Sequence, residues 1–535
     1  MIQFKGTSGV AIHRGVCKIM EKMVHVEAGN LPRIKVPQKM VSRIEKLSKR
    51  IELEKARVKR RSVKYKSPLV ISCKRSEYNH HKGQTYSDFN PQTLASHGWK
   101  HRRSVGDYFS LMPHGSNPAL LSTGRETAGW AGLSPTLLAG LKDMKIETPT
   151  KRRAIPEILR GNNVICAAET GSGKTLAYLL PLLELIQRQH RLGLAVPPKS
   201  PKAVILVPAR ELVDQIVVTD GLSPFCFHSV TYFSMVADPA SKQLDLLVST
   251  PAVLGKILQS GEVSPSNLQH IVLDEADTLL DDSFNMEIKH ILQRICAKGG
   301  APTGNEVFVT TGIQVALVSA TLPRSLDTTI GDIIPVDTFT RVTTDSLHHL
   351  MPHVRQTFFR LLSSQKTEEV VKQAKKSASG RVPTMIFCNK SSTCTWLGHV
   401  LQENGLDNTV LNGQLTGKER SERLEKFRDG ASDLMVCTDI GSRGLDTIGV
   451  EKVINFDFPL FLSDYIHRAG RVGRVGSSDN CTVISFVTHK WDVDLLWQIE
   501  IASRKSKELH NVNANIKRKL FSVGMNKQPY SSSGV

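Results

Sequence analysis

Eight consecutive residues of this 535-residue chain have the pattern of a phosphate-binding loop. They are Ala168, Glu169, Thr170, Gly171, Ser172, Gly173, Lys174 and Thr175. The two glycines allow a tight turn around a phosphate, toward which loop amides and a helix N-terminus can point. Lys174 is then placed to reach the outer phosphates, and the Thr175 hydroxyl to ligate Mg²⁺. The segment predicts an ATP site.

A second motif, HIVLDEAD (270–277), is an apolar run that ends directly in acidic residues. Buried neighbouring carboxylates are unfavourable unless a cation offsets their repulsion and desolvation. In a phosphate-loop ATPase, a second strand ends in an acid that helps to hold Mg²⁺, and Asp274 fits that role. Glu275 is placed to orient and deprotonate the attacking water. The alternative is an acidic helix cap, a role that Asp277 alone could fill.

Both motifs must be positioned by strands and helices, and the apolar runs of the sequence indicate where the strands lie. Short runs alternate with helix-compatible stretches at 163–168, 203–209, 245–250, 270–276 and 314–321, and again at 384–389, 434–439, 452–458 and 481–487. Such alternation predicts an α/β fold with two tandem parallel-sheet domains. We expect a basic, largely irregular N-terminal extension and linker over 1–127, domains over 128–345 and 346–502, and a basic tail over 503–535. Within the extension, the polar residues 78–127 suggest a linker.

Charge is concentrated at the N-terminus. Residues 1–105 hold 14 Lys and 10 Arg against seven acidic residues, which gives net +17 of the chain's total of +20. This predicts a polyanionic partner, most simply nucleic acid, although a solubilising or targeting tail is the alternative. The first 20 residues contain no acid and weakly suit a mitochondrial presequence. We find no run long and apolar enough to insert into a membrane.

The nine cysteines are scattered without a Cys-x-x-Cys pair, which argues against a disulfide framework or a zinc site. Cys388 and Cys437 lie inside apolar strand-like runs. We expect them to be core thiols.

Seven motifs occur in the order typical of the DEAD-box RNA helicases, and the chain resembles that family over roughly residues 128–490. They are AETGSGKT (168–175), PARELVDQ (208–215), DEAD (274–277), SAT (319–321), IFCNK (386–390), TDIGSRGLD (438–446) and HRAGRVGR (467–474). The segment 94–111 further resembles a vertebrate mitochondrial member linked to assembly of the large mitoribosomal subunit. The resemblance implies two RecA-like domains that close on ATP and RNA.

The resemblance also implies individual roles. Arg471 and Arg474 would be arginine fingers that reach the γ-phosphate, and Asp446 would contact the ribose of the nucleotide. His467 would join its motif to Asp277 in the DEAD loop, and Ser319 and Thr321 would link that loop to closure. RNA phosphate and ribose contacts are implied for Pro208, Ala209, Arg210, Glu211, Thr250, Pro251, Gly413, Gln414, Thr438 and Arg443. For Arg210 and Glu211, a local ion pair at a helix start is the alternative.

Three departures from the family pattern stand out. The segment ETPTKRRAIP (147–156) lacks the glutamine that reads adenine in the family and is shorter by two residues, which puts adenine selectivity in doubt. Trp130 is then a candidate to stack on the base, or else a core tryptophan. Val253 replaces a phosphate-contacting arginine. Residues 216–244 are contracted relative to the family and lack its Gly-Gly turn. One hypothesis is that the first domain binds RNA less tightly and that the basic N-terminal arm compensates. The other is that the gene structure is imperfect here.

The expected activity is ATP-dependent unwinding or remodelling of RNA, with Mg²⁺ as the metal. By resemblance, the partners are structured ribosomal RNA and mitoribosomal large-subunit particles, in the mitochondrial matrix with the nucleus as a second location. An ATP-gated RNA-binding scaffold with little turnover is one alternative. A DNA helicase or translocase is another, which the Asp-Glu-Ala-Asp and Ser-Ala-Thr motifs disfavour.

Overall fold

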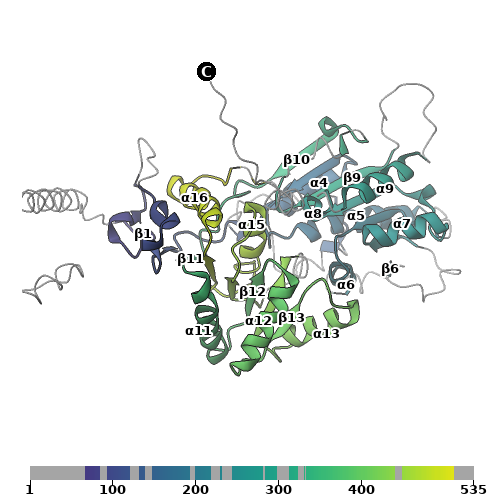
Figure 1. Cartoon of the computed structure of the whole chain (residues 1–535). Helices are drawn as coiled ribbons and strands as arrows, with labels where there is room; N and C mark the ends of the chain where they lie inside the picture. Colours follow the sequence, from purple (N-terminus) through teal and green to yellow (C-terminus); the bar gives the residue numbers. More distant parts are fainter. Residues whose placement is uncertain are drawn as a thin grey trace, which may run out of the picture. The chain divides into compact units, whose positions relative to one another are not determined.

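The apolar runs form the strands of two largely parallel sheets, which lie in the second of two compact units, Lys66–Val535 (Figure 1). The structure is a computed structural model. It describes residues 67–84, 93–120, 132–135, 137–138, 148–192, 199–218, 229–231, 244–280, 284–297, 312–322, 330–331, 333–439, 447, 449–510 and 512.

The first sheet is parallel throughout. Its order is β10 (Phe339–Thr343), β4 (Asn163–Ala167), β9 (Gln314–Ser319), β8 (His270–Asp274), β5 (Ala203–Leu206), β7 (Leu246–Ser249) and β6 (Ser229–Thr231). Along β4, Val164 and Cys166 pack into one apolar cluster and Ile165 into another. Both faces of the strand are therefore buried, which explains why the sequence shows a continuous apolar run instead of alternation.

The second sheet repeats this arrangement. Its parallel part runs in the order β13 (Thr409–Leu411), β14 (Leu434–Thr438), β12 (Thr384–Cys388), β15 (Lys452–Asn455), β16 (Thr482–Val487) and β11 (Arg355–Arg360). Cys388 and Cys437 are fully buried on its strands, as expected for core thiols, and burial raises the pKa of Cys388 well above its usual value. The predicted boundary at 345/346 falls between β10 and β11.

Helices cover the faces of both sheets. Those of the first domain are α4 (Pro149–Leu159), α5 (Lys174–Arg191), α6 (Arg210–Val218), α7 (Pro251–Ser260), α8 (Ala276–Leu279) and α9 (Asn285–Ala297). Those of the second are α11 (Lys366–Ser379), α12 (Ser391–Glu403), α13 (Gly417–Arg428), α15 (Leu462–Ala469) and α16 (Lys490–Lys505). Single 3₁₀ turns are η1 (Ser76–Tyr78), η3 (His97–Lys100), η4 (Arg102–Ser104), η5 (Pro118–Leu120), η9 (Pro265–Asn267), η10 (Val336–Thr338) and η11 (Ser363–Gln365).

Three strands from the N-terminal extension continue the second sheet beyond β11. β3 (Tyr108–Leu111) pairs antiparallel with β11, β1 (Leu69–Cys73) with β3, and β2 (His80–His81) with β1. The expectation that residues 78–127 form a linker is therefore wrong for β2 and β3. The strands are too short to stand out in a polar sequence, but Ile71 and Phe109 are fully buried in the core of the second domain.

Two buried polar contacts attach this extension. The Arg360 guanidinium donates to the carbonyl oxygens of Trp99, Val487 and Thr488 at 2.7–3.0 Å. The Glu500 carboxylate accepts from the amides of Ala95 and Ser96 and is paired with Arg504. Because buried charges are stable only when their partners are complete, these contacts fix the extension against the start and middle of α16.

The C-terminal boundary also differs from expectation. α16 continues to Lys505, and Leu509 and Val512 are buried in the same core as β1 and β3. No helix among the described residues has the length and apolar character needed to cross a membrane.

Candidate active site and RNA face

The predicted phosphate loop lies between β4 and α5, as the sequence indicates. Gly171 and Gly173 have φ angles of 77° and 80°, which favour glycine. Lys174 begins α5 and is buried, and its ammonium donates to the carbonyl oxygens of Ala168 and Glu169 at 2.9 and 3.0 Å. Thr175 follows at the helix N-terminus. The loop therefore presents the amide-rich end of an 18-residue helix together with a buried cation.

The acidic motif begins with Asp274, the last residue of β8, at the same carboxyl edge of the sheet as the phosphate loop. Asp274 is buried, and its carboxylate accepts from the Tyr178 hydroxyl at 2.9 Å and from the Glu275 amide at 2.8 Å. Burial, together with the charge of Glu275, raises the pKa of Asp274 to about 7. The two carboxylates therefore create a site that is stabilised by added positive charge.

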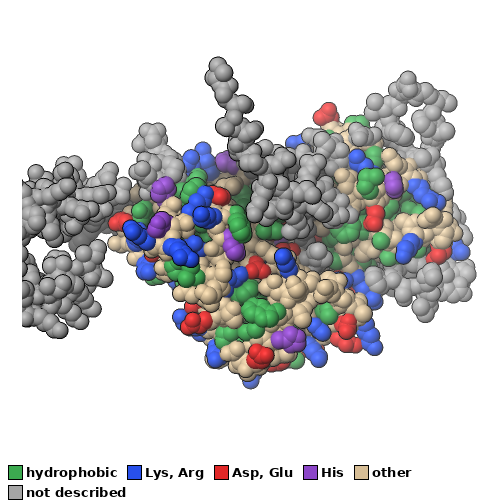
Figure 2. Space-filling view, viewed as in Figure 1, with side chains coloured by type: hydrophobic (Ala, Val, Ile, Leu, Met, Phe, Trp, Pro, Cys, Tyr) green, Lys and Arg blue, Asp and Glu red, His purple; other side chains and the backbone are tan. Residues whose placement is uncertain are grey.

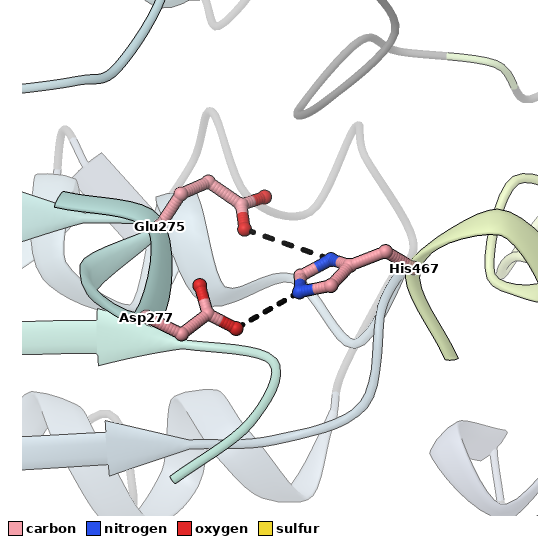
Figure 3. A group of neighbouring side chains, drawn as sticks. All are labelled: Glu275, Asp277 and His467. Atoms are coloured by element: carbon pink, nitrogen blue, oxygen red, sulfur yellow. Dashed lines mark hydrogen bonds and ion pairs between the residues drawn. The ribbon is translucent and has the colours of Figure 1, made fainter. Parts of the chain in front are cut away.

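Asp277 joins the two domains (Figure 3). The Thr321 hydroxyl after β9 donates to Asp277 Oδ2, and His467 Nε2 on α15 contacts the same oxygen at 2.9 Å. His467 Nδ1 lies 4.0 Å from Glu275 Oε2. The Ser319 hydroxyl in turn donates to the Thr321 carbonyl oxygen at 2.6 Å. All four predicted coupling residues are thus brought together, and Asp277 is a bridge rather than a simple helix cap.

A metal ion could in principle be held by Glu275, Asp277 and His467, whose ligand atoms all lie within 4.8 Å of one another. Asp277 Oδ2 already receives hydrogen bonds from Thr321 and His467, however. The arrangement is explained by contact between the domains without an ion.

The predicted arginine fingers lie on the turn after α15, against the phosphate loop. A Cβ atom on Gly470 would lie 1.8 Å from Thr170 Oγ1, and one on Gly171 would lie 3.1 Å from Arg474 Cα. Arg471 is buried, and its Nε donates to the His467 carbonyl oxygen at 3.0 Å. The close approach of glycine backbones places both arginines beside the nucleotide loop of the other domain.

Sequence reasoning missed Arg468, the neighbour of these arginines in the same motif. It is 1% exposed and donates to both carboxylate oxygens of Asp439 at 2.6 and 2.7 Å, and to Asn389 Oδ1 at 2.6 Å. Its guanidinium also donates to the Asp457 carbonyl oxygen at 2.7 Å, so Arg468 ties together the ends of β12, β14 and β15. Its regular spacing with Arg471 and Arg474 was a signal that could have found it.

The predicted RNA-contacting residues lie after strands, at the carboxyl edges of the two sheets. Pro208, Ala209 and Arg210 follow β5, Thr250 and Pro251 follow β7, Gly413 and Gln414 follow β13, and Thr438 ends β14. Gly413 and Gln414 are exposed, whereas Thr438 is buried. Trp130, Arg443 and Asp446 lie outside the described residues, as does most of the contracted segment 216–244.

The alternative of an Arg210–Glu211 pair within the first domain is wrong. Glu211 Oε1 lies 2.7 Å from Arg420 Nε on α13 of the second domain, and both side chains are largely buried. Arg210 instead lies 3.7 Å from Asp214 and packs against Gly417. An opposite charge in the other domain, which local sequence could not reveal, determines the pairing.

A buried lysine beside the phosphate loop was also missed. Lys151, in the first turn of α4, is 1% exposed. A Cβ atom on Gly173 would lie 2.7 Å from its Cε and 3.3 Å from its Nζ. The segment that lacks the expected glutamine thus adds a cation to the nucleotide loop, although nothing in its spacing indicated this contact.

Comparisons with known proteins agree with this geometry. Residues 148–329 match the DEAD/DEAH box helicase family, and residues 365–476 match the helicase conserved C-terminal domain. The mouse protein called probable ATP-dependent RNA helicase DDX28 is 39% identical over 513 residues, which cover 91% of this chain and 93% of the mouse protein. The human protein of that name is 39% identical, with 85% and 87% covered.

Solved structures show the same fold. S. cerevisiae Dbp5 bound to RNA and ADP BeF3 has a TM-score of 0.57 at 24% identity, covering 70% of this chain and 92% of that one. Mss116 bound to ssRNA and UDP-BeF has a TM-score of 0.60 at 22% identity, covering 70% and 78%.

The chain therefore belongs to the DEAD-box ATP-dependent RNA helicases, with two RecA-like domains. Within that family it is similar along most of its length to the mammalian DDX28 proteins. It is an RNA-dependent ATPase and RNA helicase.

The Glu211–Arg420 pair predicts a charge-reversal experiment. Arg420→Glu should lower RNA-stimulated ATP turnover about tenfold, because like charges would oppose closure, a cost of roughly 1.4 kcal/mol. Glu211→Arg with Arg420→Glu should recover most of the loss in a double-mutant cycle of steady-state rates. Strictly additive losses would contradict the pair. Lys418→Glu, an exposed charge reversal on the same helix, is the matched control.

The position of Lys151 beside the phosphate loop predicts an effect on nucleotide binding. Lys151→Met should weaken ATP binding about tenfold, the result of losing roughly 1.4 kcal/mol of attraction to phosphate. Thermal unfolding of the nucleotide-free variant, measured beside wild type, separates a loss of ATP affinity from a loss of stability. Arg153→Met, at an exposed position on α4, is the control. Unaltered ATP affinity in titration calorimetry would show that Lys151 only packs.

Proposed function

We propose that this helicase completes its ATP site only when its two domains close on RNA, and that it remodels ribosomal RNA during assembly of the large mitoribosomal subunit. The contact of the α15 turn with the phosphate loop supports the first part. Gly470 packs on Thr170 and Arg474 on Gly171, so the described arrangement is a closed one. Separation of the domains would withdraw both arginines from the loop.

Three cations predicted from the sequence would act on the phosphates, in addition to Lys151. Lys174 would bind the outer phosphates from the first domain. Arg471 and Arg474 would stabilise charge that develops on the transferred phosphoryl group, which is the usual role of arginine fingers. Since the arginines come from the other domain, hydrolysis would depend on closure. The backbone of Ala168–Thr175 would hold the phosphates by its amides.

Two carboxylates would divide the chemistry at β8. Mg²⁺, held by the Thr175 hydroxyl and the Asp274 carboxylate, would shield phosphate charge. The site fits this ion because both donors are oxygen, which Mg²⁺ prefers, and because the buried Asp274 carboxylate lies next to a second carboxylate, Glu275. Glu275 would orient the attacking water and accept its proton. Its Oε2 atom is buried without a hydrogen-bond partner among the described residues.

Asp277 would couple closure of the two domains to the ATP site. Its carboxylate holds Thr321 of the first domain and His467 of the second. Ser319 positions Thr321, and the Ser319 carbonyl oxygen accepts from the amide of Ala168 in the phosphate loop at 3.2 Å. A continuous set of contacts therefore connects α15 to the phosphate loop, and movement of α15 would shift the residues that bind the nucleotide.

RNA would lie along the carboxyl edges of the two sheets. Arg210, Thr250 and Pro251 would contact phosphate and ribose in the first domain, and Gly413 and Gln414 in the second. Pro208, Ala209, Thr438 and Arg443 remain candidates for the same role, and Asp446 and Trp130 for the nucleotide. Contacts to phosphate carry little sequence information. Val253, where the family has an arginine, packs against the core and would leave the first-domain grip weaker.

The proposed ribosomal RNA target and the proposed mitochondrial location are supported by separate observations. The chain is similar to the DDX28 proteins over more than four-fifths of its length. Its first 105 residues carry net +17, which suits a structured polyanion such as ribosomal RNA. The acid-free start suits import into the matrix. Partners would be large-subunit assembly particles.

Catalysis is tested by ATP turnover of the purified chain with and without RNA, beside Glu275→Gln. RNA should raise the turnover of the wild type, and the variant should lose at least about 100-fold because water activation is removed. RNA binding with ATP should persist in the variant. If wild type and variant turn over equally slowly while both bind RNA, the chain is an ATP-gated scaffold instead.

Location and target are tested in cells. A reporter carrying residues 1–40 should enter mitochondria, and exclusion of that reporter would count against the matrix assignment. Crosslinking of the full chain should recover mitochondrial large-subunit ribosomal RNA above background. Glu275→Gln should increase that recovery, since it would bind RNA without completing the cycle; recovery of unrelated RNA alone would contradict the target.

A further inference from the structure

A basic and aromatic surface lies far from the phosphate loop in the sequence and is not used by the mechanism above. We call it the Trp491 surface. It consists of Lys100, His101, Arg102, Arg103, His489, Lys490 and Trp491. All seven side chains are exposed, and Trp491 is 60% exposed, more than is usual for so large an apolar group.

The surface is assembled by the second-domain fold from two distant parts of the chain. The Arg360 guanidinium donates to Trp99 at the end of η3 and to Thr488 just before α16. Lys100 Nζ lies 2.5 Å from Asp494 Oδ1 on α16 and 4.6 Å from the centre of the Trp497 ring. The extension and the helix are therefore held together, and the surface is not a chance feature of a loose arm.

Helix geometry places Trp491 on the same face of α16 as Asp494, the residue that pairs with Lys100. Trp491 and Asp494 are three residues apart on α16, so they are neighbours on one face. Asp494 contacts Lys100, which is followed directly by His101, Arg102 and Arg103. Figure 2 shows Lys, Arg and His side chains gathered over the region of β1 and α16.

The indole is held as a platform. Its ring centre lies 4.4 Å from that of His489, with only 9° between the planes. One face of the Trp491 ring is thus supported by a parallel imidazole, while most of the side chain remains open to solvent. A supported, exposed indole is suited to stacking of a planar group.

The charge of the Trp491 surface indicates which class of ligand would supply the planar group. Acidic side chains near the surface are already engaged: Asp494 with Lys100, and Asp107 with Arg75 and Lys74. The surface also carries three exposed cations, Arg102, Arg103 and Lys490, besides Lys100, which is paired with Asp494. Cations for phosphates and a platform for bases together suit nucleic acid better than an apolar protein segment.

We propose that the Trp491 surface is a second RNA-binding site, at which an unpaired base stacks on Trp491 and neighbouring phosphates contact Arg102 and Arg103. The proposal rests on RNA being the ligand of this helicase. The site would hold a long RNA while the carboxyl edges of the two sheets cycle through closure and opening. A short single strand would occupy only those edges.

The test compares a short single-stranded RNA with a long RNA that carries a stem and unpaired flanks, using the full chain. Trp491→Ala should weaken binding of the long RNA about tenfold, within the range known for loss of one base–aromatic stack. Arg102→Ala with Arg103→Ala should reduce the slope of log affinity against log salt by about 1.4, or about 0.7 for each lost phosphate contact. Fluorescence anisotropy measures both.

Matched controls come from the same domain. Trp396→Ala removes another exposed tryptophan, 47% exposed on α12, and Lys372→Ala with Lys375→Ala removes two exposed cations on α11. Neither control should change long-RNA affinity more than about twofold, as expected of substitutions outside the contact. Equal losses in control and test variants would overturn the proposal.

ATP turnover stimulated by the short RNA separates this proposal from the function above. Trp491→Ala should leave that turnover within about twofold of wild type, because the surface lies outside the ATP site. Wild-type long-RNA affinity in both test variants would overturn the second site and favour a protein partner there. Absent stimulation in the wild type would instead contradict the proposed catalysis. UV crosslinking of the long RNA to a peptide containing Trp491 would support direct contact.

Discussion

The closed arrangement depends on one buried carboxylate. Asp277 Oδ2 receives hydrogen bonds from Thr321 in its own domain and from His467 in the other. A buried carboxylate with an incomplete set of donors is unstable, so separation of the domains must be compensated by water or another group. That requirement makes Asp277 sensitive to the distance between the domains, and the glycines at 171 and 470 allow the backbone approach that brings His467 within reach.

Each of the two sheets contributes its carboxyl edge to the ATP site that the two domains share. In each, parallel strands are buried on both faces and their carboxyl ends lie at one edge, where loops are free to carry polar residues. The phosphate loop and acidic motif come from one edge, and the arginines come from the α15 turn of the other domain. Ion pairing of Glu211 with Arg420 adds a second cross-domain contact at the predicted RNA face.

The N-terminal extension is in part a component of the second domain. Buried Glu500 and Arg360 can be satisfied only when residues 95–99 are in place, so β1, β3 and α16 stabilise one another. A truncation that removes residues 30–105 would therefore disturb the fold as well as the charge.

The sequence by itself determined the phosphate loop, the acidic strand end and the order of the α/β elements. These depend on local chemistry: glycine at positive φ, apolar runs for buried strands, and a lysine at a helix start. Strands such as β2, β3 and β13 escaped because two to four residues carry too weak a pattern. Only the tertiary structure decided that Glu211 pairs with Arg420, that Lys151 lies on Gly173, and that Lys100 pairs with Asp494. Each of these contacts joins residues on separate elements, and their proximity follows from packing of the whole fold, which local spacing does not encode.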